Sequence, residues 1–159
     1  MALVKYNNNS ISDVTALAGL PAGAMTLIKT LTASSSSTLS FVDGSSDVVL
    51  DNTYPIYLFK FINIHPATDS SSADAELLFQ VDTGTNTNYN QTITSTYFRS
   101  QHDESGSSGA LGYRTSGDQA QGTGFQKLAE GQGADNDQSL SGSLTLFEPS
   151  SSVFVKHFL

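Results

Sequence analysis

The sequence predicts an all-β fold, an antiparallel β-sandwich or jelly roll, and three observations support this. Ser and Thr make up about a quarter of the 159 residues, whereas only 14% of the residues are charged. This composition is typical of β proteins with many turns. About ten short apolar segments recur at regular spacing, as in sandwiches and jelly rolls. Clusters of Gly, Asn, Asp and Ser, which favour tight turns, separate them.

The first 24 residues differ from the rest and are expected to form an extended N-terminal arm and a hinge. Apolar residues recur every three positions from Ile11 to Leu20, but Gly19, Pro21 and Gly23 limit any helix to a single turn. The segment has no apolar run or cleavage signature typical of a secretory signal peptide, so none is expected. No segment of the chain reaches the roughly 20 apolar residues of a membrane span.

Residues 25–159 are expected to form one β domain, because apolar and polar residues alternate along most of its segments. In the segment from Ser139 to Phe147, for example, Leu140, Leu144 and Leu146 share one face and hydroxyl residues share the other. The last segment has no turn or polar tail after it, which predicts a strand paired by a neighbour, or the front part of a longer chain. The expected strands are Met25 to Ala33, Thr38 to Asp43, Asp47 to Asp51, Thr53 to Pro66, Ala75 to Asp82, Gln91 to Ser100, Ala110 to Thr115, Gly124 to Ala129, Ser139 to Phe147 and Ser152 to Leu159.

The strand from Thr53 to Pro66 is apolar on both faces. Its even positions form an aliphatic face interrupted by Lys60, and its odd positions form an aromatic face of Tyr57, Phe59 and Phe61. A strand in a two-layer sandwich has one inner face, so a loop, the N-terminal arm or another subunit must cover the second. If a subunit does so, the expected interface residues are Tyr57, Phe59, Phe61, Phe154 and Phe158, the last two from the final strand.

Charge and residue types exclude several classes of partner and site. The net charge of −8 and the pI of about 4.5 disfavour binding to nucleic acid and to anionic membranes. The chain has no Cys, so it has no disulfide, thiolate metal site or cysteine nucleophile. No cofactor is expected.

Candidate chemistry is sparse. His65, His102 and His157 stand far apart, and none has a second His or Cys at metal-ligand spacing. The run HDES from His102 to Ser105 is not a triad signal, since triad residues come from distant positions of a chain. The loop around Asp135 to Asp137 has oxygen ligands but lacks the Gly and Glu of a calcium-binding EF-hand loop, so an Asx-turn is the simpler interpretation. The sequence therefore predicts no catalytic, cofactor-binding or metal site.

Tyrosines offer one further possibility, a platform on which sugar rings stack, because Tyr has a flat apolar ring with a polar tip. Most of these tyrosines alternate with apolar neighbours, which favours a place in the core or at an interface. The tyrosines concerned are Tyr54, Tyr57, Tyr89, Tyr97 and Tyr113.

Several phrases resemble structural proteins of tailed bacteriophages of marine bacteria, including cyanophages, described as tail-fibre-like or virion-associated. These phrases are MTLIKTLTASSSSTLSFVDG, YPIYLFKFINIHPATD, TNYNQTITSTYFRSQHDE and GQGADNDQSLSGSLTLFEPSSSVFVKHFL. The resemblance covers nearly all of residues 25–159. It implies a place in the virion, on the capsid or tail, and it brings no catalytic residue with it.

Together these observations predict a non-enzymatic virion protein, a fibre, spike or decoration subunit that assembles with copies of itself and with other virion proteins. Symmetric homo-oligomers are the default for such parts, and a trimer would suit a fibre or spike. The alternative is a carbohydrate or receptor-binding module at the end of a tail fibre, with a host surface glycan as ligand. A third hypothesis is a polysaccharide depolymerase, which would need two carboxylates roughly 5–10 Å apart in a cleft.

Overall fold

The computed structural model describes residues 25–67, 75–84, 86–103, 105–133 and 137–159, and within these ranges the chain forms strands and no helix. Every strand pair is antiparallel, so the predicted all-β antiparallel class is confirmed. The predicted N-terminal arm lies outside the described residues. The strands are β1 (Ile56–Ile64), β2 (Ala75–Phe79), β3 (Ile93–Thr94), β4 (Phe98–His102), β5 (Gly109–Tyr113), β6 (Ala120–Gly122), β7 (Gln126–Gln132), β8 (Leu140–Phe147) and β9 (His157–Phe158).

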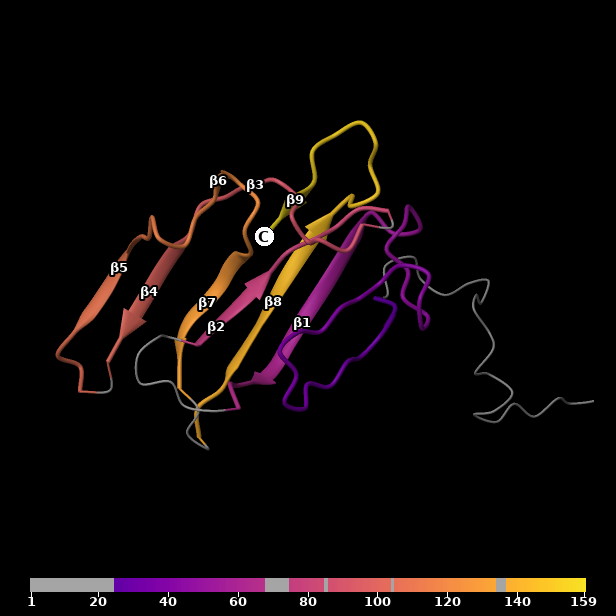
Figure 1. Cartoon of the computed structure of the whole chain (residues 1–159). Coiled ribbons are helices and arrows are strands. Elements are labelled where there is room, and N and C mark those ends of the chain that lie inside the picture. Colours follow the sequence, from indigo (N-terminus) through magenta and orange to yellow (C-terminus); the bar gives the residue numbers. More distant parts are fainter. Residues whose placement is uncertain (1–24, 68–74, 85, 104, 134–136) are drawn as a thin grey trace, which may run out of the picture.

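The strands form four small sheets. The largest has the order β1-β8-β9, and the other three are the pairs β2-β7, β3-β6 and β4-β5. Figure 1 shows β5 at one margin of the molecule and β1 near the opposite margin, with β7, β2 and β8 between them. Strands far apart in sequence therefore meet, as β1 and β8 do.

The β1–β8 ladder holds most of the core. Tyr57 lies opposite Leu146 and Phe59 opposite Leu144, so four large side chains share one face of the sheet. Both leucines are buried, which confirms the face predicted for them. Near the end of β1 the register shifts, and there Asn63 has a φ of 54° and its N–H donates to Ser141 Oγ at 3.1 Å. This irregularity ends the regular pairing.

The aromatic face of β1 is covered by the segment that precedes it. The ring of Phe41 packs edge-on against Phe59 at 5.4 Å between centroids, and the ring of Tyr54 packs against Tyr57 at 5.9 Å. The Tyr57 hydroxyl donates to the carbonyl of Asp51 at 2.9 Å. Of the covers considered from the sequence, a loop of the same chain is therefore the one in place.

The prediction of three strands between Met25 and Asp51 was wrong, because residues 25–51 form coil and turns. Positive φ angles at Gly44, Ser46 and Asp47 interrupt any ladder there. The Asp43 carboxylate accepts the N–H of Leu50 at 2.8 Å and closes the turn. Phe41 of this segment packs on Phe59 of β1, and no residue of the segment pairs as a strand.

The predicted last strand is also shorter than expected, since only His157 and Phe158 pair with β8. The Ser151 hydroxyl accepts the N–H groups of Val153 and Phe154, and this turn holds residues 152–155 away from the sheet. The final strand is nonetheless paired within the chain, because Leu159 and Thr145 exchange two backbone hydrogen bonds of 2.7 and 3.0 Å.

Candidate interaction surface

The structure separates the five residues predicted for a subunit interface. Tyr57 is only 4% exposed, and Phe59 and Phe61 are half-buried. Phe158 lies opposite Leu146 and packs on Phe79 at 5.5 Å, which ties the β1-β8-β9 sheet to the β2-β7 sheet. Phe154 alone protrudes, and it is 73% exposed in the loop before β9. That these residues meet a partner stays a prediction.

The surface left uncovered on β1 is the aliphatic face. Ile56, Leu58 and Ile62 are exposed, and Lys60 stands exposed between them opposite Ser143. The sequence analysis assigned the aromatic face to a possible subunit contact, whereas the aliphatic face is the one that the structure leaves exposed. The missing signal was the position of Phe41 and Tyr54, which lie over the aromatic face in the folded chain.

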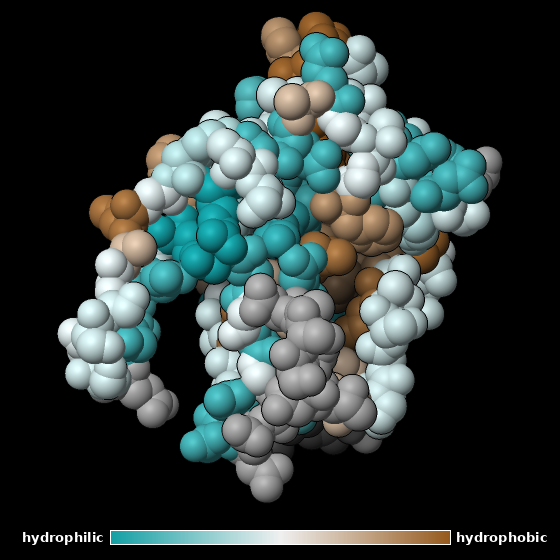
Figure 2. Space-filling view, turned by 60° about the vertical axis from the view of Figure 1, so that its left-hand side comes forward, coloured by the Kyte–Doolittle hydropathy of each residue, from teal (hydrophilic) through white to brown (hydrophobic). Residues whose placement is uncertain are grey.

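Exposed apolar side chains outnumber buried ones. Among the described residues sixteen large hydrophobic side chains are exposed, whereas five are buried: Val48, Tyr57, Ile93, Leu144 and Leu146. Figure 2 shows brown, hydrophobic atoms reaching the surface at several separate places between polar regions. Two such groups, besides the aliphatic face of β1, are Val153, Phe154 and Val155 in the last loop, and Phe98, Leu111 and Tyr113 on the β4–β5 hairpin.

The sheets also fail to close on one another. A hollow of about 620 Å³ opens between the β1-β8-β9 sheet, the β2-β7 sheet and residues 94–97. Apolar side chains including Phe61, Leu77, Leu128 and Leu144 line it. The hollow is open to solvent, and polar side chains including Gln126, Ser143 and Lys156 line it together with the apolar ones.

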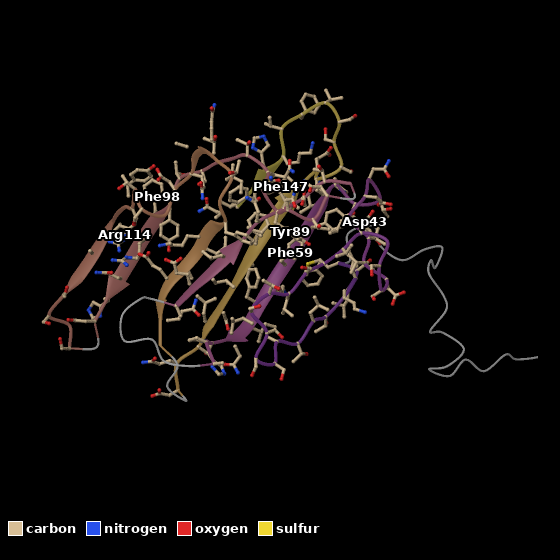
Figure 3. All side chains as sticks on the ribbon, viewed as in Figure 1. Asp43, Phe59, Tyr89, Phe98, Arg114 and Phe147 are labelled. Atoms are coloured by element: carbon tan, nitrogen blue, oxygen red, sulfur yellow. The ribbon has the colours of Figure 1, made fainter. Side chains whose placement is uncertain are left out.

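The β4–β5 hairpin carries the most exposed aromatic pair. The rings of Phe98 and Tyr113 lie 5.4 Å apart, and Leu111 beside them is 81% exposed. The Tyr113 hydroxyl donates to the carboxylate of Asp118, which raises the pKa of Tyr113. In Figure 3 Phe98 lies far from Tyr89, so Tyr89 and the tyrosine paired with Phe98 do not share one sugar-stacking platform.

A cluster of charged side chains fixes the hairpin to the rest of the fold. The carboxylate of Glu130, on β7, has a side chain only 2% exposed, and it accepts Arg99 Nη1 at 2.5 Å, Arg114 Nε at 2.9 Å and Lys127 Nζ at 2.9 Å. Lys127 also pairs with Glu76 of β2 at 2.5 Å. Figure 3 shows Arg114 beside the hairpin. We call these five residues the Glu130 cluster.

The Glu130 cluster stabilises the position of the hairpin, because each of its charged side chains pairs with one of opposite charge. The hydrogen bond from Lys127 holds the pKa of Glu130 below its ordinary value, although burial opposes this. Burial raises the pKa of the neighbouring Tyr97, and the Glu130 charge adds to that effect. Sequence reasoning missed the cluster because Arg99, Arg114 and Glu130 carry no motif. Only the order of the strands brings them together.

Gly117 is held against the Tyr97 ring, and this close approach gives a test of the local packing. A Cβ at Gly117 would overlap the ring, whereas a Cβ at Gly142 would meet no atom within 4 Å. We expect Gly117→Ala to lower the free energy of unfolding by about 2 kcal/mol, since the ring must move. Gly142→Ala should change it by less than about 0.5 kcal/mol. Equal effects in chemical denaturation would show that Tyr97 does not pack there.

The remaining candidates for chemistry stay apart. His65, His102 and His157 are all exposed and lie on different segments. In the run that starts at His102, the Asp103 carboxylate accepts the hydroxyls of Ser105 and Ser107, as in an ordinary turn. Within the part of the chain that the structure describes, no three His, Cys, Asp or Glu side chains gather as metal ligands. Asp135 and Asn136 lie outside that part.

The described ranges contain no helix that is long and apolar enough to cross a membrane. No protein-family model matches the chain, and searches of curated proteins and of solved structures found no match either.

Proposed function

We propose that the chain is a non-enzymatic structural protein of a bacteriophage particle, a fibre, spike or decoration subunit that acts by assembling on the capsid or tail. One observation carries the assembly part of this proposal. A single copy leaves sixteen large apolar side chains exposed in the described ranges and buries five. Large exposed apolar patches on ordered strands are typical of interaction surfaces.

The small size of the core limits the stability of a single copy. Each large apolar side chain contributes about 1.5–3 kcal/mol when it is fully buried, and fixing the backbone of each residue costs about 1–2 kcal/mol. The five buried side chains and the half-buried ones around them offset only part of the cost of ordering such a chain. Copies that bury apolar surface against one another would gain stability, and the gain would rise with the apolar area that is buried between them.

The proposed architecture is a β-sandwich that assembly completes. Three of the four antiparallel sheets border a hollow of about 620 Å³, and the contact of Phe158 with Phe79 already joins two of the sheets. The sequence resemblance to virion-associated phage proteins supports a place in the particle. The polar turns and the net charge of −8 would keep its outer surface soluble. A trimer is the favoured oligomer for a fibre or spike.

The test of assembly is the mass and the melting temperature over a wide range of protein concentration. We expect light scattering to give a multiple of 16.8 kDa at high concentration, and the melting temperature to rise with concentration, because oligomers dissociate as they unfold. A monomer that melts cooperatively at one temperature throughout would contradict the proposal. Mass spectrometry of purified phage particles that carry this gene would then test whether the protein is part of the virion.

The alternative, a carbohydrate-binding module, is favoured by one observation, the exposed pair of Phe98 and Tyr113 with the Asp118 carboxylate beside it. Aromatic rings next to carboxylates suit sugars, because the ring stacks on the apolar face and the oxygens accept hydroxyl protons. This group is small, and Tyr89 lies away from it. Assembly therefore accounts for more of the exposed surface.

A further inference from the structure

The outer edge of β5 is free among the described residues. Two hydrogen bonds flank the β4–β5 ladder, Arg114 N–H to the Tyr97 carbonyl at 2.8 Å and Asp103 N–H to the Ser108 carbonyl at 2.9 Å. They show that the even-numbered residues of β5 turn their backbone groups toward β4. Because these groups alternate along a strand, those of Gly109, Leu111 and Tyr113 point away from β4.

This edge lacks the usual protection against pairing. Its sequence is GALGY, with no charge and no Pro, and all five residues are exposed. Natural proteins protect free edges with Lys, Pro, bulges or a covering loop. β1 has such protection, because it carries Lys60 and ends in a register shift. In Figure 1 no element lies beyond β5, whereas the segment before β1 runs alongside β1.

We propose that β5 pairs with β5 of a second copy, antiparallel and across a two-fold axis that passes by Leu111. The inference rests on the proposed assembly of copies and specifies one of its contacts. Pairing of an exposed edge with another chain is a common recognition mode of sheets, because the backbone supplies the hydrogen bonds.

The backbone of β5 is self-complementary in this register. Leu111 would face Leu111 of the second copy, and Gly109 would face Tyr113. All three are residues whose backbone groups point outward. Each has one N–H and one C=O, so three residues from each copy would make six hydrogen bonds. A shift by one residue would place inward-pointing groups opposite outward-pointing ones and lose these bonds.

The side chains fit the same register. Tyr113 would stand opposite Gly109 of the second copy, which has no side chain to obstruct the Tyr113 ring where it packs on Phe98. The two Leu111 side chains, now 81% exposed, would contact each other on one face.

At the ends of β5, Arg114 would lie opposite Ser108 of the second copy, whose N–H is bonded to the Asp103 carboxylate at 3.1 Å. The Arg114 side chain stays bound to Glu130 of its own chain. The symmetry places Arg114 opposite Ser108 twice. By itself the contact gives a dimer, and it would join two trimers back to back in a hexamer of dihedral symmetry.

The absence of Cys from the chain allows a direct test. In the proposed register the two Leu111 residues form a hydrogen-bonded pair with Cα atoms about 5.5 Å apart, so two thiols at this position lie within reach of a short thiol-specific crosslinker. We expect Leu111→Cys to be joined into a covalent dimer by a short bismaleimide reagent. Ser45→Cys, at an exposed turn position outside the apolar groups, controls for random collisions. Equal yields at the two sites would overturn the inference.

A second variant removes the pairing without a thiol. The N–H of Leu111 points outward, so Leu111→Pro deletes it and leaves the bonds to β4 in place, and Pro is tolerated in this way on edge strands. We expect at least tenfold weaker association with an unchanged far-ultraviolet dichroism spectrum, whereas Leu111→Thr, which keeps the N–H, should lose less. If the wild type is oligomeric but neither Leu111 variant behaves as stated, this contact is wrong and the proposed assembly stands. If the wild type is a monomer, both the β5 contact and the proposed assembly are wrong.

Discussion

Glu130→Ala should lower the free energy of unfolding by about 2–3 kcal/mol, because it removes the buried carboxylate that Arg99 and Arg114 share and leaves these two cations without it. Arg99, Arg114 and Lys127 all donate to that one carboxylate, whose side chain is 2% exposed. Chemical denaturation of the wild type and the variant measures the difference.

Glu76→Ala is the matched control within the same cluster. Glu76 is a third exposed and pairs with Lys127 alone, and pairs of this kind contribute about 0–1 kcal/mol. A loss as large as that of Glu130→Ala would mean that the cluster has no buried centre. A negligible loss for Glu130→Ala would show that the hairpin does not depend on it.

The cluster also determines a dependence on pH. The pKa of Glu130 is lowered in the folded chain from its ordinary value of 4.5, chiefly by the hydrogen bond from Lys127. Its contribution to stability is therefore complete above pH 4.5 and is lost as the pH falls through the lowered pKa. Glu130→Gln should reduce the acid-dependent loss of stability that denaturation at a series of pH values measures.

Leu144→Ala should lower the free energy of unfolding by a similar amount, about 3 kcal/mol, because it leaves a cavity in a very small core. Leu144 is 2% exposed and lies opposite Phe59 in the β1–β8 ladder. Such a loss is a large part of the stability of an ordinary domain. We expect the melting temperature to fall by several degrees or more.

Leu58→Ala controls for Leu144→Ala because Leu58 lies in the same ladder on the opposite, exposed face. Measured at a concentration where copies are dissociated, it should cost less than about 1 kcal/mol. If Leu58→Ala cost as much as Leu144→Ala under those conditions, the assignment of the buried face would be reversed.

Local alternation predicted the strands that form ladders with one apolar face. The segment from Ser139 to Phe147 became β8 with Leu144 and Leu146 buried, and Ala110 to Thr115 became β5. Alternation could not distinguish a strand from a covering segment, since both need apolar side chains on one side. Phe41 has its place because it packs on Phe59, which lies in a distant strand.

Side-chain hydrogen bonds account for another difference from the prediction. The predicted strand from Gln91 to Ser100 divides into β3 and β4, because the Ser95 hydroxyl donates to the Gln126 amide and accepts the N–H of Gln119. β6 at Ala120 to Gly122 was not predicted, since its sequence has no alternation to signal it. Contacts of this kind depend on which strands become neighbours, and the sequence does not display that order.

The pairing of β1 with β8 also bears on how fast the chain can fold. Six strands separate these two in the sequence, so the central ladder joins segments from nearly opposite ends of the described domain. Contacts between such distant segments slow folding, because a long loop must close before they form. Until the ladder forms, β1, which is apolar on both faces, stays accessible to other chains. The subunits would therefore be most prone to aggregate during synthesis, before any particle is assembled.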